Sequence, residues 1–123
     1  MISPRILVVD DDFNVREVLK RLLEKEGYKV MEAKDGKDAL KCHKKAPADL
    51  IITDLFMPEK DGFEVINELN NISDNTKIIA ISGGFLLDPE NYLPLAETLG
   101  VQATFTKPIN KYKLLSAVKY FVG

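Results

Sequence analysis

Six polar side chains stand at or just after the ends of short apolar segments in this chain. Segments 6–9, 50–53 and 77–81 suit strands buried on both faces, and a shorter, less apolar segment covers 103–106. In an open parallel sheet, ligands bind outside the carboxyl ends of the strands. We therefore expect one shared site for these side chains: Asp10, Asp11, Asp12, Asp54, Ser82 and Lys107.

The acidic members of this set predict a divalent cation. Two carboxylates about 5 Å apart repel by roughly 3 kcal/mol at an effective dielectric near 20. A bound cation offsets this cost, and hard oxygen ligands in an open site suit Mg²⁺ or Mn²⁺. Lys107 offers a second positive charge. Asp12 is better explained as a helix cap, because a carboxylate after a strand often accepts the first N–H groups of the next helix.

Strand and helix patterns alternate along the whole chain. Residues 28–33 add another short strand, and this strand and 103–106 are expected at the outer edges of the sheet. Apolar residues recur at helical spacing over 15–23, followed by a helix stop at Gly27, and over 38–45, 63–69, 91–99 and 110–121. Five strand–helix pairs predict an α/β fold: a doubly wound five-stranded parallel sheet covered by helices on both faces.

Composition limits the classes of function. The chain is 46% hydrophobic and 29% charged, with a net charge of −2, and it carries no basic block that would neutralise nucleic-acid phosphates. No apolar run is long enough for a membrane span, and no signal peptide is recognised. We expect one domain over residues 1–123, cytoplasmic, without an internal disulfide because Cys42 is the only cysteine. Cys42 is expected in the core and His43 at the boundary or in solvent.

The combined motifs resemble a known family. They are Ile6-Leu7-Val8-Val9-Asp10-Asp11-Asp12, Ile51-Ile52-Thr53-Asp54-Leu55-Phe56-Met57-Pro58, Asp61-Gly62, Ser82 and Lys107-Pro108. In order and spacing the chain resembles the receiver domain of bacterial two-component response regulators, of the single-domain, chemotaxis-regulator-like kind. The resemblance covers residues 6 to about 121. It implies the (βα)5 flavodoxin-like fold with strand order 2-1-3-4-5.

The resemblance also implies a role for each site residue. Asp54 matches the phosphorylation site, which accepts a phosphoryl group from a phosphohistidine. Asp10 and Asp11, with Asp54 and the backbone carbonyl of Phe56, match the ligands of Mg²⁺. Ser82 and Lys107 match the groups that bind the phosphoryl oxygens. The Lys107–Pro108 peptide bond is expected to be cis, which proline permits at small cost.

The implied partners are proteins. A sensor histidine kinase or a phosphotransfer protein would supply the phosphoryl group, and a downstream protein would read a changed surface formed by the fourth helix, fifth strand and fifth helix. Ser82, the following Gly83 and Thr104 are expected to take part in this change. The resemblance is also compatible with a homodimer, and with either a complete protein or a part of a larger regulator or hybrid kinase. Direct nucleic-acid and membrane contacts are not expected.

This chain departs from the family pattern at three positions. Thr104 stands where receivers commonly carry a switching Tyr or Phe, Gly84 replaces a more usual polar residue, and Phe56 is a bulky apolar group beside the acceptor. Gly83-Gly84 makes the loop after Ser82 more pliable. We therefore expect a different switching route and a changed lifetime of the aspartyl phosphate, which a Phe56→Asn variant would test.

Two other functions fit parts of the sequence. A degenerate receiver would bind partners without being phosphorylated, although all the key positions are filled. The Asp-x-Asp of Asp10 and Asp12 also resembles the first motif of haloacid-dehalogenase-type phosphohydrolases, in which Asp10 would be the nucleophile. Asn14 departs from that motif, and the chain is short for such an enzyme. We therefore expect no enzyme activity beyond the chain's own phosphorylation and dephosphorylation.

Overall fold

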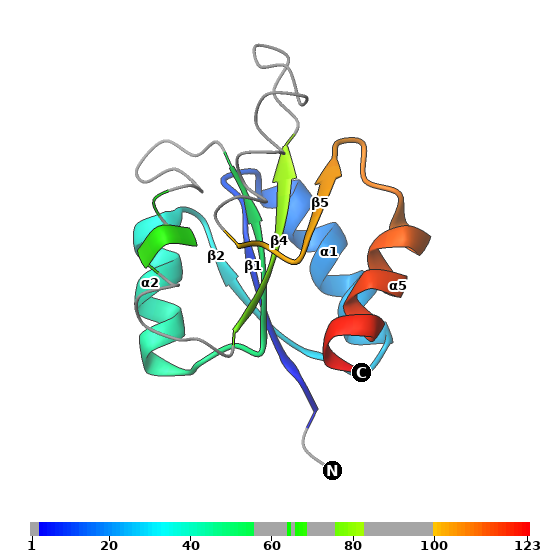
Figure 1. Cartoon of the computed structure of the whole chain (residues 1–123), viewed down its shortest axis with the longest axis horizontal. Coiled ribbons are helices and arrows are strands. Elements are labelled where there is room, and N and C mark those ends of the chain that lie inside the picture. Colours follow the sequence, from blue (N-terminus) through cyan, green and yellow to red (C-terminus); the bar gives the residue numbers. More distant parts are fainter. Residues whose placement is uncertain (1–2, 56–63, 65, 69–75, 83–99) are drawn as a thin grey trace.

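A five-stranded parallel sheet forms the centre of the molecule (Figure 1). The computed structural model describes residues 3–55, 64, 66–68, 76–82 and 100–123. The strand order is β2-β1-β3-β4-β5. Its elements are β1 (Arg5–Val9), α1 (Phe13–Lys25), β2 (Lys29–Ala33), α2 (Gly36–Lys45), β3 (Leu50–Asp54), β4 (Lys77–Ser82), β5 (Ala103–Thr106) and α5 (Lys111–Val122). The predicted α/β class, strand order and outer positions of β2 and β5 are confirmed.

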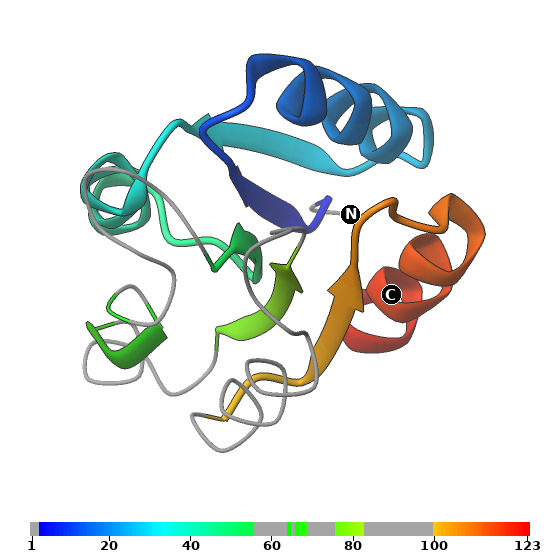
Figure 2. The same cartoon turned by 90° about the horizontal axis from the view of Figure 1, so that it is seen from above.

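The central strands are buried on both faces, which divides the core into two layers. On one face Ile6 and Val8 of β1 pack with Leu19 of α1 and Leu114 of α5. On the other face Leu7 and its neighbours pack against α2. Figure 2 shows α1 and α5 on one side of the sheet and α2 on the other. This double burial explains why the strands read as continuous apolar runs rather than as alternating patterns.

Polar side chains set the starts of the helices. Asp12 caps α1, Asp35 caps α2 and Asn110 caps α5, each by accepting a hydrogen bond from a backbone N–H in the first turn. Because Asp35 is the cap, α2 begins at Gly36, two residues before the predicted start. Gly27 has φ of 92°, a conformation that favours glycine, and it follows the end of α1 as predicted.

The third and fourth predicted helices fall largely outside the described residues. Residues 64 and 66–68 are helical, within the predicted range 63–69. Ile66 is fully buried in the same core layer as α2. The rest of that range and the whole of 91–99 lie outside the residues that the structure describes.

The expectation for His43 is wrong, because its side chain is only 2% exposed. Its Nδ1 accepts a hydrogen bond of 3.1 Å from the Ala48 N–H, and its Nε2 lies 3.5 Å from the Thr76 hydroxyl oxygen. That hydroxyl donates to the Ala48 carbonyl, so it accepts from the imidazole. His43 follows Ala39 by four residues and so lies on the buried face of α2, where its ring contacts Ala48 and Thr76.

Candidate functional site

Asp10 occupies the point where β1 leaves the sheet. Its backbone N–H still donates to the Ala33 carbonyl at 3.1 Å, and its side chain is only 2% exposed. The carboxylate Oδ1 accepts a 2.9 Å hydrogen bond from the Asp12 N–H, which fixes the turn into α1. Burial raises the pKa of Asp10, as does the nearby charge of Asp54, while the bonds from Asp12 and Lys107 act in the opposite direction.

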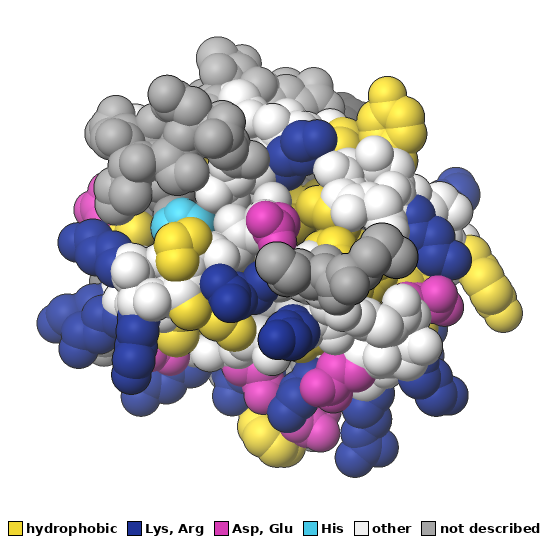
Figure 3. Space-filling model, turned by 90° about the horizontal axis from the view of Figure 1, so that it is seen from below, with side chains coloured by type: hydrophobic (Ala, Val, Ile, Leu, Met, Phe, Trp, Pro, Cys, Tyr) yellow, Lys and Arg dark blue, Asp and Glu magenta, His cyan; other side chains and the backbone are white. Residues whose placement is uncertain are grey.

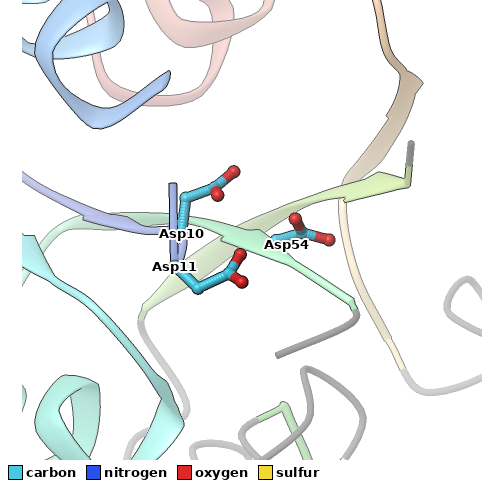
Figure 4. Close-up of side chains that lie close together, drawn as sticks. All are labelled: Asp10, Asp11 and Asp54. Carbon is cyan, nitrogen blue, oxygen red and sulfur yellow. The ribbon is translucent and has the colours of Figure 1, made fainter. Parts of the chain in front are cut away.

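Asp54 is the last residue of β3 and lies beside β4. It pairs in register with Ile81, and its side chain is buried. Asp11 follows Asp10 and is exposed. Figure 4 shows these three carboxylates gathered at the ends of β1 and β3, and one oxygen from each lies within 4.8 Å of the others. We call Asp10, Asp11 and Asp54 the acidic cluster.

Lys107 supplies a positive charge to two members of the acidic cluster. Its Nζ lies 3.0 Å from Asp10 Oδ2 and 2.9 Å from Asp54 Oδ2. Burial favours the neutral amine, but the hydrogen bonds to Asp54 and Asp10 outweigh it and raise the pKa of Lys107. The lysine therefore stays charged. The Lys107–Pro108 peptide bond that follows is cis.

Asp12 has a separate role from its two neighbours. Its Oδ1 accepts a 2.8 Å hydrogen bond from the Asn14 N–H at the start of α1. It is exposed, and it is not among the residues grouped in the acidic cluster. The prediction that Asp12 is a helix cap is confirmed.

Of the remaining predicted site residues, the structure describes two and leaves two outside the described ranges. Ser82 ends β4 and pairs in register with Thr106, which places its backbone at the same edge of the sheet. Thr104 is half-buried in β5, pairs with Ala80, and lines a hollow of about 350 Å³ with Lys113 of α5. Phe56 and Gly83 lie outside the described residues.

An arginine that the sequence patterns did not indicate also contacts the site. Arg16, in the first turn of α1, donates from Nη1 to the backbone carbonyl of Asp10 at 2.7 Å. The only available sequence signal was a basic residue shortly after the acidic turn. Such a residue is common on exposed helix faces, so the contact becomes visible only in three dimensions.

An apolar hollow lies beside the acidic cluster. It has a volume of about 330 Å³ and lies between α1 and the segment that leads into α5. Val15 and Val18 line it from α1. Pro108 and Ile109 line it from the other side, together with Lys107. Val18 is 48% exposed, although its helical spacing predicted burial. The site therefore combines a charged centre with an apolar border.

The donor set fits a hard divalent cation. Three carboxylates from two strand ends converge within 4.8 Å, and two of them are buried, so their repulsion is costly without positive charge.

The face at the opposite edge of the sheet carries charges of both signs. Figure 3 shows basic and acidic side chains interspersed over the visible surface of that face.

The family comparison agrees with this geometry. Residues 6–119 match the family described as the response regulator receiver domain. The chain belongs to this family. It is a receiver, that is, a phosphoryl-accepting signalling module of two-component systems. The phosphohydrolase alternative is therefore not favoured.

Curated relatives show receivers in different settings. The receiver is 30% identical to sporulation initiation phosphotransferase F of Bacillus subtilis, with 99% of this chain and 96% of that protein covered. It is 35% identical to the CAI-1 autoinducer sensor kinase/phosphatase CqsS of Vibrio cholerae over 96% of this chain but 17% of that protein. It spans about half (52%) of response regulator RR06 of Streptococcus pneumoniae, at 35% identity. Similar domains thus make up almost the whole of one relative and only a part of the other two.

Solved structures show the same fold. Chemotaxis protein CheY4 of Vibrio cholerae matches with a TM-score of 0.85 and 30% identity, covering 98% of this chain and 99% of that one. A signal receiver domain of a histidine kinase from Syntrophus aciditrophicus matches with a TM-score of 0.84 and 31% identity, over 98% and 90%. Among the described residues, no helix has the length and apolar character needed to cross a bilayer.

Proposed function

We propose that Asp54 is the phosphorylated residue of this receiver. The observation that carries the proposal is the bridging of Asp10 and Asp54 by Lys107, at 3.0 and 2.9 Å, within a cluster of three carboxylates. Asp54 is buried at a strand end, and its carboxylate, the kind of group that can act as a nucleophile, lies 2.9 Å from the Lys107 amine.

Asp10, Asp11 and Asp54 would hold Mg²⁺ or Mn²⁺, with the Phe56 carbonyl as a further ligand that the family resemblance implies. When bound, the ion would supply positive charge to the phosphoryl oxygens, whose charge is spread over three atoms during transfer. Lys107 would stabilise the same charge from its own side. The Ser82 hydroxyl, Gly83 and Thr104 are proposed to respond to the phosphoryl group.

The chemical step is a transfer between two protein groups. A carboxylate oxygen of Asp54 attacks the phosphorus of a phosphohistidine, and the phosphorus–nitrogen bond breaks. The departing imidazole keeps the bonding electron pair and takes one proton from solvent, so it ends as neutral histidine. The donor is proposed to be a sensor histidine kinase or a phosphotransfer protein. The apolar hollow that Lys107 helps to line supports a protein donor, because an exposed apolar area suits contact with another protein.

The product would alter how other proteins bind. An aspartyl phosphate adds negative charge and three acceptor oxygens to a pocket that holds Lys107. We propose that this change reaches the surface formed by β5 and α5, where a downstream protein binds. The fourth helix, which the family resemblance adds to this surface, lies outside the described residues. No direct contact with nucleic acid or a membrane is proposed, and a homodimer through this surface is an option.

Acetyl phosphate provides the direct test of the acceptor. With Mg²⁺ present, intact-protein mass spectrometry should show a gain of one phosphoryl group, which chelation prevents. Asp54→Asn should abolish the gain. Asp49→Asn is the matched control, because Asp49 is an exposed aspartate at the other end of the same strand and should leave the gain intact. The absence of any gain in the wild-type protein would favour the degenerate, purely protein-binding receiver.

A further inference from the structure

Arg16 contacts the backbone of the acidic cluster directly. Its Nη1 lies 2.7 Å from the Asp10 carbonyl oxygen, which is short for a nitrogen–oxygen hydrogen bond and is typical of a charged donor. The side chain is only 14% exposed, and its guanidinium lies 5.7 Å from the centre of the Phe13 ring. The arginine is therefore packed into the protein rather than extended into solvent.

Glu32 of β2 holds the other side of this guanidinium. Arg16 Nε lies 3.5 Å from Glu32 Oε1, and Lys20 Nζ lies 3.6 Å from Glu32 Oε2. Arg16 thus joins three parts of the molecule: helix α1, strand β2 and the turn after β1. A guanidinium suits this task because its donors point in several fixed directions at once.

The Asp10 carbonyl has a specific need for such a donor. Val9 is the last residue of β1 that pairs with both neighbouring strands, opposite Ala33 and Thr53. Beyond it the chain leaves the sheet, so the Asp10 carbonyl needs a hydrogen-bond donor from elsewhere. The same peptide unit joins Asp10 to Asp11. Holding its oxygen therefore restricts the directions in which both carboxylates leave the backbone.

We propose that Arg16 is a positioning residue for the acidic cluster. By holding the peptide unit between Asp10 and Asp11, it keeps the two carboxylates directed toward Asp54 and so raises the affinity for the divalent ion. This inference rests on the proposed function, because it assigns Arg16 to the metal site proposed above. The side chain of Arg16 contacts the Asp10 backbone, Glu32 and Phe13, and the role proposed for it is to position the carboxylates rather than to bind the ion itself.

The variants separate this contact from charge and from helix stability. Arg16→Met removes the donors and keeps an unbranched side chain, whereas Arg16→Lys keeps the positive charge without the fork of donors. Arg21→Met is the matched control, because Arg21 is an arginine on the same helix whose side chain is 81% exposed and pairs with Glu17. Glu32→Gln weakens the support of Arg16 without removing its bond to Asp10.

Two properties are measured for each folded variant: its affinity for Mn²⁺ and its amide hydrogen exchange. A Mn²⁺ titration should show affinity about tenfold lower in Arg16→Met, the size of loss found when supporting groups of metal ligands are removed. The Mn²⁺ affinities of Arg16→Lys and Glu32→Gln should lie between those of Arg16→Met and the wild type. The affinity of Arg21→Met should equal that of the wild type. Hydrogen exchange without metal should be faster at the Asp12 amide of Arg16→Met, relative to amides of β3, because that amide bonds Asp10 Oδ1.

The outcomes distinguish this inference from the proposed function. Wild-type Mn²⁺ affinity together with unchanged Asp12 exchange in Arg16→Met would overturn the positioning role, even if chemical denaturation shows lower overall stability. If the wild-type protein itself failed to bind Mn²⁺ or to gain a phosphoryl group, the proposed function would fail instead. The metal-free exchange measurement would then still decide whether Arg16 holds the turn.

Discussion

Lys107 Nζ lies 2.9 Å from Oδ2 of Asp54, although 53 residues separate them in sequence. The same amine reaches Asp10 Oδ2 at 3.0 Å, across 97 residues. One cation thus neutralises part of the charge of two buried carboxylates. A divalent ion held by this cluster would be attracted to the same two carboxylates, so the binding of the ion would be coupled electrostatically to the charge of the lysine.

Replacing Lys107 with methionine should tighten metal binding and slow phosphorylation. Removing a unit positive charge roughly 5 Å from a bound divalent ion would be worth about 1.7 kcal/mol even at the dielectric of water, or about 15-fold in affinity. Phosphoryl transfer should slow because one of the charges that stabilise the phosphoryl oxygens is lost. A Mn²⁺ titration and the rate of mass gain with acetyl phosphate measure the two effects.

Lys111→Met is the matched control for the lysine variant. Lys111 is an exposed lysine at the start of α5 that borders the same apolar hollow. It should leave both the affinity and the rate unchanged. Weaker metal binding in Lys107→Met would contradict the electrostatic coupling and would indicate that the lysine holds the carboxylates in place.

Replacing Asp11 with asparagine should stabilise the metal-free protein. The substitution removes one negative charge within 4.8 Å of two others, which is worth about 1 kcal/mol per neighbour at the dielectric of water. Asp11 is exposed, so little burial is lost. Urea denaturation without metal should therefore give a higher midpoint, while the Mn²⁺ affinity falls. A lower midpoint would show that Asp11 makes contacts worth more than the repulsion.

Asp12 should respond to substitution as a helix cap rather than as a metal ligand. Asp12→Ala should lower the free energy of unfolding by about 1 kcal/mol, because the Asn14 N–H loses its acceptor. Asp12→Asn should keep most of that stability, since asparagine caps helices equally well. Both changes should alter Mn²⁺ affinity much less than Asp11→Asn does. Equal losses of affinity in the Asp11 and Asp12 variants would make Asp12 a ligand.

The buried imidazole of His43 should make stability depend on pH. Burial lowers its pKa below the ordinary value of 6.5, so the unfolded chain binds the proton more readily than the folded protein does. The stabilisation is complete above about pH 6.5 and is lost as the pH falls below it, at up to about 1.4 kcal/mol per pH unit. Protonating Nδ1 would also break its bond to the Ala48 N–H.

His43→Gln provides the comparison for this pH effect. A glutamine oxygen can accept from the Ala48 N–H but does not titrate in this range. Denaturation between pH 5 and pH 7 should therefore give a smaller loss of stability in the variant. Asp10, whose pKa is raised, titrates in both proteins, so their difference isolates the histidine. Parallel pH profiles would mean that His43 is not responsible.

Local sequence patterns were sufficient for much of the fold. Continuous apolar runs identified the strands because strands covered on both faces contain few polar residues. Their polar ends placed Asp10, Asp54 and Lys107 at one edge, since parallel strands end on the same side. The cap at Asp12 could also be predicted, because a cap depends only on the next few residues.

Contacts between distant segments decided what local patterns could not. His43 was expected at the boundary or in solvent, but the Ala48 N–H and the Thr76 hydroxyl hold its ring inside the protein. The start of α2 depended on a hydrogen bond from Asp38 to Asp35, which outweighed the apolar spacing. The bond from Arg16 to Asp10 gave no distinct signal in the sequence.

The sequence by itself determined the order of the described elements, the acidic character of the site and its family, because these depend on residue types and spacing along the chain. Only the tertiary structure decided which charges meet. Lys107 reaches Asp10 and Asp54 because parallel pairing brings β1, β3, β4 and β5 together with their carboxyl ends on one edge. The physical reason is that the energy between two charges depends on their separation in space, and the packing of the elements sets that separation.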